Sequence, residues 1–188
     1  MPKIAEVEYT PNPNARKFIL REPLTWGVAR SFESAAAAEA AGDRLASALF
    51  EAGPVTNVYY VDHWITVTQD GTAAWDELLR ALAVPIREAA AADAQSSETV
   101  ATAVAARADM DATTLERLDR INALLDEQIR PYLQNDGGNL EVIDLTETEL
   151  TVHYQGACGS CPSSTAGTLS AIENVVRTIE PELTVVAV

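Results

Sequence analysis

The first part of the chain contains four stretches whose apolar positions predict β-strands. Residues 4–9 alternate between apolar and polar side chains, and a turn-forming segment, residues 10–14, separates them from the apolar run Phe18-Ile19-Leu20. Two further runs of β-branched and aromatic residues, 55–61 and 64–68, follow later in the chain. Because these runs are close neighbours in the sequence, they predict a tight hairpin.

The same part of the chain shows the spacing that is typical of amphipathic helices. An alanine-rich segment, residues 34–50, carries apolar side chains at helical spacing and stops before Gly53-Pro54. A second helix follows the last predicted strand and is marked by Trp75, Leu78, Leu79, Leu82 and Ile86. Residues 1–90 therefore predict a small α+β domain with the order ββαββα.

Residues 91–111 lack the large apolar side chains that a packed core needs. They consist mainly of alanine, serine, threonine and aspartate, and we interpret them as an acidic, Ala-rich linker. Because alanine favours helix, part of this linker is expected to act as a semi-rigid spacer rather than as a free string.

A second small α+β domain is predicted over residues 112–188. It begins with a clear apolar stripe, residues 115–133, which predicts one helix ending at Asn135-Asp136-Gly137-Gly138. Alternating runs on either side of residues 146–149 predict a hairpin, and a further helix and a last strand follow. The expected order is αββαβ, with the sequence Cys158-Gly159-Ser160-Cys161 between the second strand and the second helix.

The chain is strongly acidic, with 28 acidic and 13 basic residues and a net charge of −15. Phosphate backbones and anionic lipids repel such a chain, so we expect neither nucleic acid nor a membrane as a partner. The N-terminal residues lack the layout of a signal or transit peptide, and no apolar run reaches the roughly 20 residues of a membrane-spanning helix. Both cysteines lie in one short loop, which is typical of a reducing compartment, and a cytoplasmic location is expected.

The loop from Cys158 to Cys161 is the main candidate functional site. Two residues between the thiols suit the ligation of one metal centre, and Gly156 and Gly159 allow the backbone to turn tightly. Pro162 is expected as the first residue of the following helix, whose N–H groups and dipole favour thiolate over thiol. Since few large side chains surround the loop in the sequence, we expect an open site.

The number of cysteines limits how this site can bind a metal. Tetrahedral zinc and cubane iron–sulfur clusters take four protein ligands, whereas this chain has 2 cysteines. A second copy of the chain is the simplest source of the missing pair, which predicts a homodimer around a shared centre. A cluster held near the surface between two chains is accessible to competing thiolates of an acceptor protein, which favours cluster transfer.

Two other hypotheses remain open on the motif. A C-x-x-C sequence at a helix start is also the arrangement of thioredoxin-like dithiol–disulfide oxidoreductases, but their motif follows an early strand of a βαβ unit. Here the motif follows a hairpin and precedes the final helix. The remaining hypothesis is a zinc-stapled dimer, in which the metal has a purely structural role.

The other polar candidates are interpreted as structural. His63 falls in a hairpin turn, His153 lies on the face of its strand opposite to Val152, and Asp136 precedes two glycines in a turn. We find no Ser-His-Asp set, phosphate-binding glycine loop or pair of catalytic carboxylates, so neither an enzyme nor a catalytic residue is predicted. The tryptophans are expected in the core of the first domain; they are Trp26, Trp64 and Trp75. If Trp26 is instead exposed, it would suit a contact with a partner.

Two segments of the second domain resemble a known family. Arg130-Pro131-Tyr132-Leu133-Gln134-Asn135-Asp136-Gly137-Gly138, followed by Gly156-Ala157-Cys158-Gly159-Ser160-Cys161-Pro162-Ser163-Ser164-Thr165, resembles the C-terminal domain of NifU, the Nfu domain. This resemblance spans residues 113–188. Residues 10–14, Lys17-Phe18 and 64–68 resemble the N-terminal domain of mitochondrial and bacterial Nfu proteins. The linker departs from the family, because it is longer than the short connection expected there.

The resemblance implies an iron–sulfur cluster scaffold or carrier. Such proteins assemble a 4Fe-4S cluster, or receive one from an upstream assembly scaffold, hold it between two subunits and deliver it to apo iron–sulfur proteins. Cys158 and Cys161 match the family's ligand pair, which makes them the expected metal and cluster ligands of each chain. The resemblance also implies that the first domain recognises partners. This domain contains no cysteine with which to ligate the cluster.

Overall fold

The chain folds into two compact α+β units, as the sequence predicts. The computed structural model describes residues 3–90, 111–159 and 164–188. The first unit comprises residues Met1–Ser96 and the second comprises Ser97–Val188. Most of the predicted linker lies outside the described residues, and its last residue, Asp111, is the N-cap of the first helix of the second unit.

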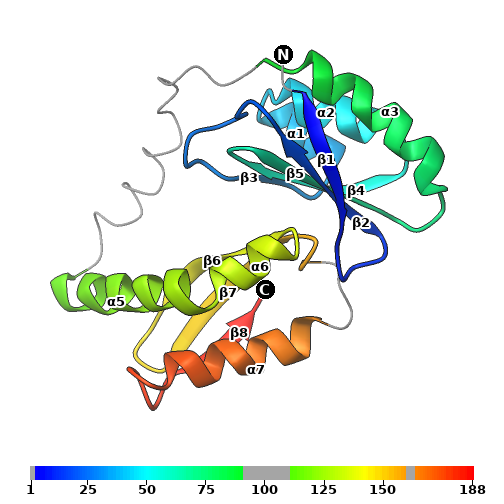
Figure 1. The fold of residues 1–188 in the computed structure, drawn as a ribbon. Coiled ribbons are helices and arrows are strands. Elements are labelled where there is room, and N and C mark those ends of the chain that lie inside the picture. Colours follow the sequence, from blue (N-terminus) through cyan, green and yellow to red (C-terminus); the bar gives the residue numbers. More distant parts are fainter. Residues whose placement is uncertain (1–2, 91–110, 160–163) are drawn as a thin grey trace. The chain divides into compact units, whose positions relative to one another are not determined.

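The first unit is built on a five-stranded antiparallel sheet (Figure 1). The strand order is β1-β2-β5-β4-β3, so the predicted hairpin of β4 and β5 lies in the interior of the sheet, and its turn places Asp62 at a φ of 46°. The strands are β1 (Ile4–Tyr9), β2 (Ala15–Leu20), β3 (Arg30–Phe32), β4 (Val55–Val61) and β5 (Trp64–Gln69). The sequence pattern does not predict β3, because this strand is too short to show alternation and is defined by its pairing with β4.

The helices of the first unit are α1 (Ala35–Ala40), α2 (Arg44–Glu51) and α3 (Trp75–Glu88). The prediction of one helix over residues 34–50 is wrong, because the backbone leaves the helix at Gly42, whose φ is +67°. Asp43 then starts α2, and its carboxylate accepts a hydrogen bond of 2.9 Å from the Ala46 N–H. The helices pack on one sheet face through a shared core that includes Phe18, Val58, Ile65, Leu49 and Leu82.

The second unit packs three helices on one face of a three-stranded sheet (Figure 1). Strands β6 and β7 are antiparallel, and β8 lies parallel to β7. The elements are α5 (Ala112–Gln128), α6 (Arg130–Asn135), β6 (Gly138–Leu145), β7 (Glu149–Gly156), α7 (Ser164–Val176) and β8 (Thr184–Ala187). None of the helices within the described residues is long and apolar enough to span a membrane.

The predicted single helix over residues 115–133 is broken between α5 and α6. Ile129 has a φ of −118°, and Pro131 in the first turn of α6 has no N–H to donate to the preceding turn. Arg130 stabilises this break, because its guanidinium donates to the Leu140 carbonyl at 3.1 Å and to the Asn122 side-chain oxygen at 2.8 Å. One side chain therefore joins α5, α6 and β6.

Replacing Arg130 with lysine is expected to destabilise the second unit by about 1–3 kcal/mol. An ammonium group cannot reproduce the planar fork that reaches two acceptors on different elements. The matched control is Arg177→Lys, because Arg177 is 47% exposed, follows the last residue of α7 and pairs with Glu173 in the last turn of that helix. Urea unfolding followed by circular dichroism should show a change within about 0.5 kcal/mol for the control, and equal changes in both variants would contradict this role.

Candidate metal centre at the cysteine loop

Cys158 lies two residues beyond the end of β7, in the turn that leads toward α7. Its side chain is only 4% exposed and belongs to the core of the second unit, so the expectation of an open site is wrong at Cys158. Cys161, Pro162 and Ser163 lie outside the described residues, and so does the prediction that Pro162 is the first helical residue.

Glycines shape the backbone around Cys158. Gly156 has a φ of +66°, a conformation that a side chain disfavours, and the Gly159 N–H donates to its carbonyl at 3.2 Å. The Ala157 N–H donates to the Gly137 carbonyl at 3.1 Å. The cysteine turn is therefore hydrogen-bonded to the turn that follows α6, which explains why two sequence segments about 20 residues apart form one site.

The two glycines after Asp136 have different roles. Gly137 has a φ of +80° and ends α6, as the sequence predicts. Gly138 leaves room for Cys158: a Cβ atom at position 138 would lie 2.4 Å from the Cys158 Sγ and 2.8 Å from the Gln155 carbonyl oxygen. The absence of a side chain at Gly138 therefore allows the thiol to sit against the first residue of β6.

Tyr154 is a second residue of the site that sequence analysis missed. Its side chain is 5% exposed, and its hydroxyl has no hydrogen-bond partner among the described residues. Burial raises the pKa of Tyr154 to about 12, and the negative charge of the Cys158 thiolate contributes to the same shift. The hydroxyl therefore keeps its proton at neutral pH. The sequence signal that could have identified Tyr154 is a polar aromatic residue at a core position of β7, just before the glycine turn.

The remaining candidates behave as structural residues. The Nδ1 atom of His153 lies 2.9 Å from the Val188 carbonyl oxygen, which confirms a satisfied histidine, and His63 is exposed in its hairpin turn. Asp136 is the C-cap of α6, as expected for a turn residue. Trp64 and Trp75 are partly buried, whereas Trp26 is 57% exposed, so its assignment to the core is wrong.

Within the part of the chain that the structure describes, the cysteine loop offers a thiol as its metal-ligating side chain. Among residues 3–90, 111–159 and 164–188, no three His, Cys, Asp or Glu side chains gather where they could hold one metal ion. The residues around Cys158 instead supply a thiol, close backbone approach at Gly138 and an unsatisfied hydroxyl donor at Tyr154. A thiolate ligand with a nearby hydrogen-bond donor is typical of a sulfur-rich metal centre.

Comparison with known proteins gives matches for both units. The family model described as scaffold protein Nfu/NifU N terminal matches residues 4–93, and the model described as NifU-like domain matches residues 121–187. The nitrogen fixation protein NifU of Anabaena sp. (strain L31) is 47% identical over 77 residues, which are 40% of this chain and 69% of that protein.

Mitochondrial relatives match along both units. The NFU1 iron-sulfur cluster scaffold homolog of Drosophila willistoni is 30% identical over 183 residues, 95% of this chain and 61% of its own length. The human homolog is 29% identical over 181 residues, with 95% and 68% covered. This chain thus spans between 61% and 69% of these three relatives. Staphylococcus aureus SAV1430, a solved structure, gives a TM-score of 0.39 at 19% identity over 44% of this chain and 96% of its own, which adds nothing to the fold.

The fold and the matched regions define a two-unit α+β protein whose second unit matches the NifU-like domain. The chain belongs to the Nfu family of scaffold proteins. The resemblance predicted from the two sequence segments is therefore confirmed.

Proposed function

We propose that this chain is an iron–sulfur cluster carrier, which holds a 4Fe-4S cluster between two copies through Cys158 and Cys161 of each. The observation that carries the proposal is the Cys158 thiol, which lies against Gly138 and shares a buried core with Tyr154, whose hydroxyl is an unsatisfied donor. The relatives named as iron-sulfur cluster scaffolds support the same cargo. No catalytic step is assigned to this chain, which binds and releases the cluster.

The ligand count supports a shared cluster. A cubane takes four protein ligands, and the chain has 2 cysteines. Because the described residues offer no cluster of three other metal-binding side chains, two copies of the cysteine loop are the simplest complete ligand set. The homodimer forms when the cluster binds, and the cluster holds it together.

A shared cluster is suited to transfer. Thiolates of a recipient can replace the ligands of one subunit, after which the dimer has no complete ligand set and the cluster moves on. We propose that an upstream assembly scaffold supplies the cluster and that apo iron–sulfur proteins receive it. A cytoplasmic location remains our proposal from the sequence.

Transfer itself provides the experiment. The chain loaded anaerobically with iron and sulfide should restore activity to an apo enzyme that needs a 4Fe-4S cluster, faster than free iron and sulfide do in the presence of a chelator. A loaded chain that performs no better than the free ions would contradict the carrier role. Dithiol-dependent reduction of insulin without cluster uptake would favour an oxidoreductase, and tightly held zinc that iron cannot displace would favour a structural staple.

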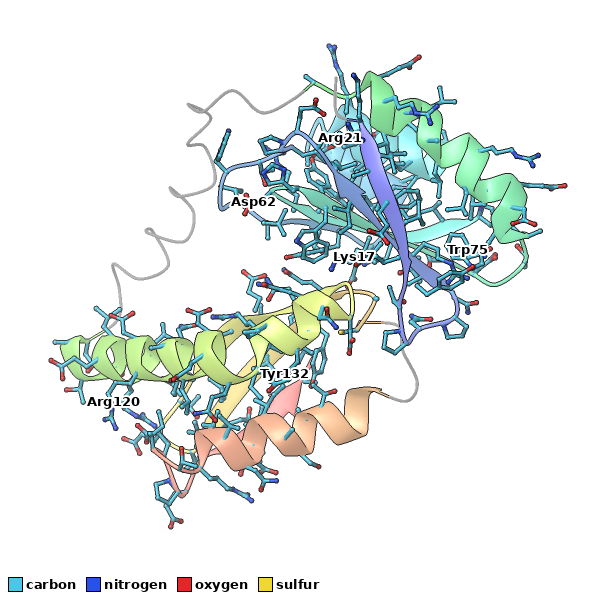
Figure 2. The ribbon with its side chains drawn as sticks, in the orientation of Figure 1. Lys17, Arg21, Asp62, Trp75, Arg120 and Tyr132 are labelled. Atoms are coloured by element: carbon cyan, nitrogen blue, oxygen red, sulfur yellow. The ribbon has the colours of Figure 1, made fainter. Side chains whose placement is uncertain are left out.

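We further propose that the first unit recognises partners through Trp26. The neighbours of Trp26 are fixed to the β4–β5 turn: the Gly27 N–H donates to the Asp62 carboxylate at 2.6 Å, and the Asp62 N–H donates to the Thr25 hydroxyl at 2.7 Å. The Leu24 N–H also donates to the Asp62 carbonyl at 2.7 Å. Figure 2 shows Asp62 beside the loop that leads from β2 to β3. These bonds hold the chain on both sides of the exposed Trp26 in place, which reduces the backbone entropy lost when a partner binds.

Replacing Trp26 with alanine is expected to weaken binding to a recipient by about 10-fold or more, because buried tryptophans dominate many interfaces. Cluster content should not change. The matched control is Val84→Ala on α3, which removes another exposed apolar side chain of the same unit. Binding to an apo enzyme that accepts the cluster can be measured by calorimetry. Equal affinities of the two variants for this enzyme would contradict the proposed role of Trp26.

A further inference from the structure

The hydroxyl of Tyr154 has no partner that explains its position. It is buried in the core of the second unit, to which Cys158 also belongs, and it has no hydrogen-bond partner among the described residues. A buried donor without an acceptor destabilises a folded protein, whereas phenylalanine would fill the same space without this penalty. The tyrosine is therefore better explained by a state of the site in which its hydroxyl finds an acceptor.

The backbone places Tyr154 next to the cysteine turn. A Cβ atom at Gly159 would lie 3.0 Å from the Tyr154 carbonyl oxygen, so the turn folds back onto this residue. Tyr154 pairs with Leu140 in the β6–β7 ladder, two positions from the Gly138–Gly156 pair that adjoins Cys158. Tyr154 and Cys158 also belong to the same buried core, and the charge of Cys158 adds to the effect of burial in raising the pKa of Tyr154.

We propose that the Tyr154 hydroxyl donates a hydrogen bond to the Cys158 sulfur when that sulfur ligates the cluster, and that this bond slows cluster release. The inference rests on the proposed carrier function. A thiol is a weak acceptor, whereas a metal-bound thiolate carries negative charge and accepts strongly. Hydrogen bonds to cluster sulfurs are also one of the factors that set the reduction potential. Tyr154 is thus a positioning and tuning residue, and it is not itself a ligand.

The test compares Tyr154→Phe with the wild-type chain, since this change removes a single oxygen atom. In the loaded dimer, the variant should release iron to a chelator about 3- to 10-fold faster, as expected for the loss of one hydrogen bond, and its reduction potential should become more negative. In the apo chain, the same variant should unfold at a higher urea concentration, because the unsatisfied hydroxyl is gone.

The control is Tyr132→Phe, which removes a hydroxyl from an exposed tyrosine on α6 of the same unit (Figure 2). It should match the wild type in release rate, potential and stability. Equal release rates and potentials for Tyr154→Phe and the wild type, both loaded, would overturn the proposed bond and leave the carrier function intact. A wild-type chain that takes up no cluster would overturn both proposals.

Discussion

Cys158→Ser should abolish cluster binding, lowering the iron content from about four per two chains to below about 0.5. Serine is close in size to cysteine, but its hydroxyl is not ionised at neutral pH and is a poor ligand for iron. Because both copies carry the change, the shared site loses half of its thiolates at once. The loaded protein should also run as a monomer in anaerobic gel filtration, since the cluster joins the two copies.

Cys161→Ser should have the same effect, because each ligand of the pair is required. The apo variants must remain folded for the result to count, which far-UV circular dichroism and urea unfolding can establish. If serine is poorly accommodated at the buried position, Cys158→Ala removes the ligand without adding a buried hydroxyl. A folded variant that still binds about four irons per dimer would exclude Cys158 as a ligand.

Gly138→Ala should disrupt the site without removing any ligand. The new Cβ would meet the Cys158 Sγ at 2.4 Å and the Gln155 carbonyl oxygen at 2.8 Å. The second of these atoms belongs to the backbone of β7, so rotation of the thiol alone cannot relieve the clash. We expect a loss of about 1–3 kcal/mol in the stability of the second unit and a several-fold reduction in cluster uptake.

The matched control is Gly167→Ala on α7, where a new Cβ would meet no atom of the described residues within 4 Å. Alanine is favoured over glycine inside a helix by up to about 1 kcal/mol, so this variant should be as stable as the wild type or more so. Both variants can be compared by urea unfolding and by cluster absorbance after anaerobic reconstitution. Wild-type uptake by a stable Gly138→Ala variant would show that the contact with Cys158 is dispensable.

Sequence patterns predicted the class of fold because both units bury apolar stripes of regular period. The apolar pattern of α5 continues into α6, across the backbone break at Ile129. For this reason the pattern predicted one helix where the structure has two. The break depends on Pro131 and on the bonds of Arg130 to residues that are distant in sequence. The break at Gly42 was also missed, because alanine favours helix on both sides of it and the pattern continues across the glycine.

The site was predicted only in part. The cysteine motif is visible as a local pattern, and its likeness to a known family defined the expected cargo. The contact of Gly138 with Cys158 depends on the register of β6 and β7, which pairs Gly138 with Gly156, and no local pattern reports it. The burial of Cys158 and the unsatisfied Tyr154 hydroxyl arise from packing in three dimensions, so they too became visible only in the structure.

Native mass spectrometry of the anaerobically reconstituted protein tests the central claim most directly. We expect a species with the mass of two chains and one 4Fe-4S cluster, which disappears in the Cys158→Ser variant together with the dimer. A cluster bound to a single chain, or a cluster-bound dimer that persists without Cys158, would contradict a cluster shared through the cysteine loops.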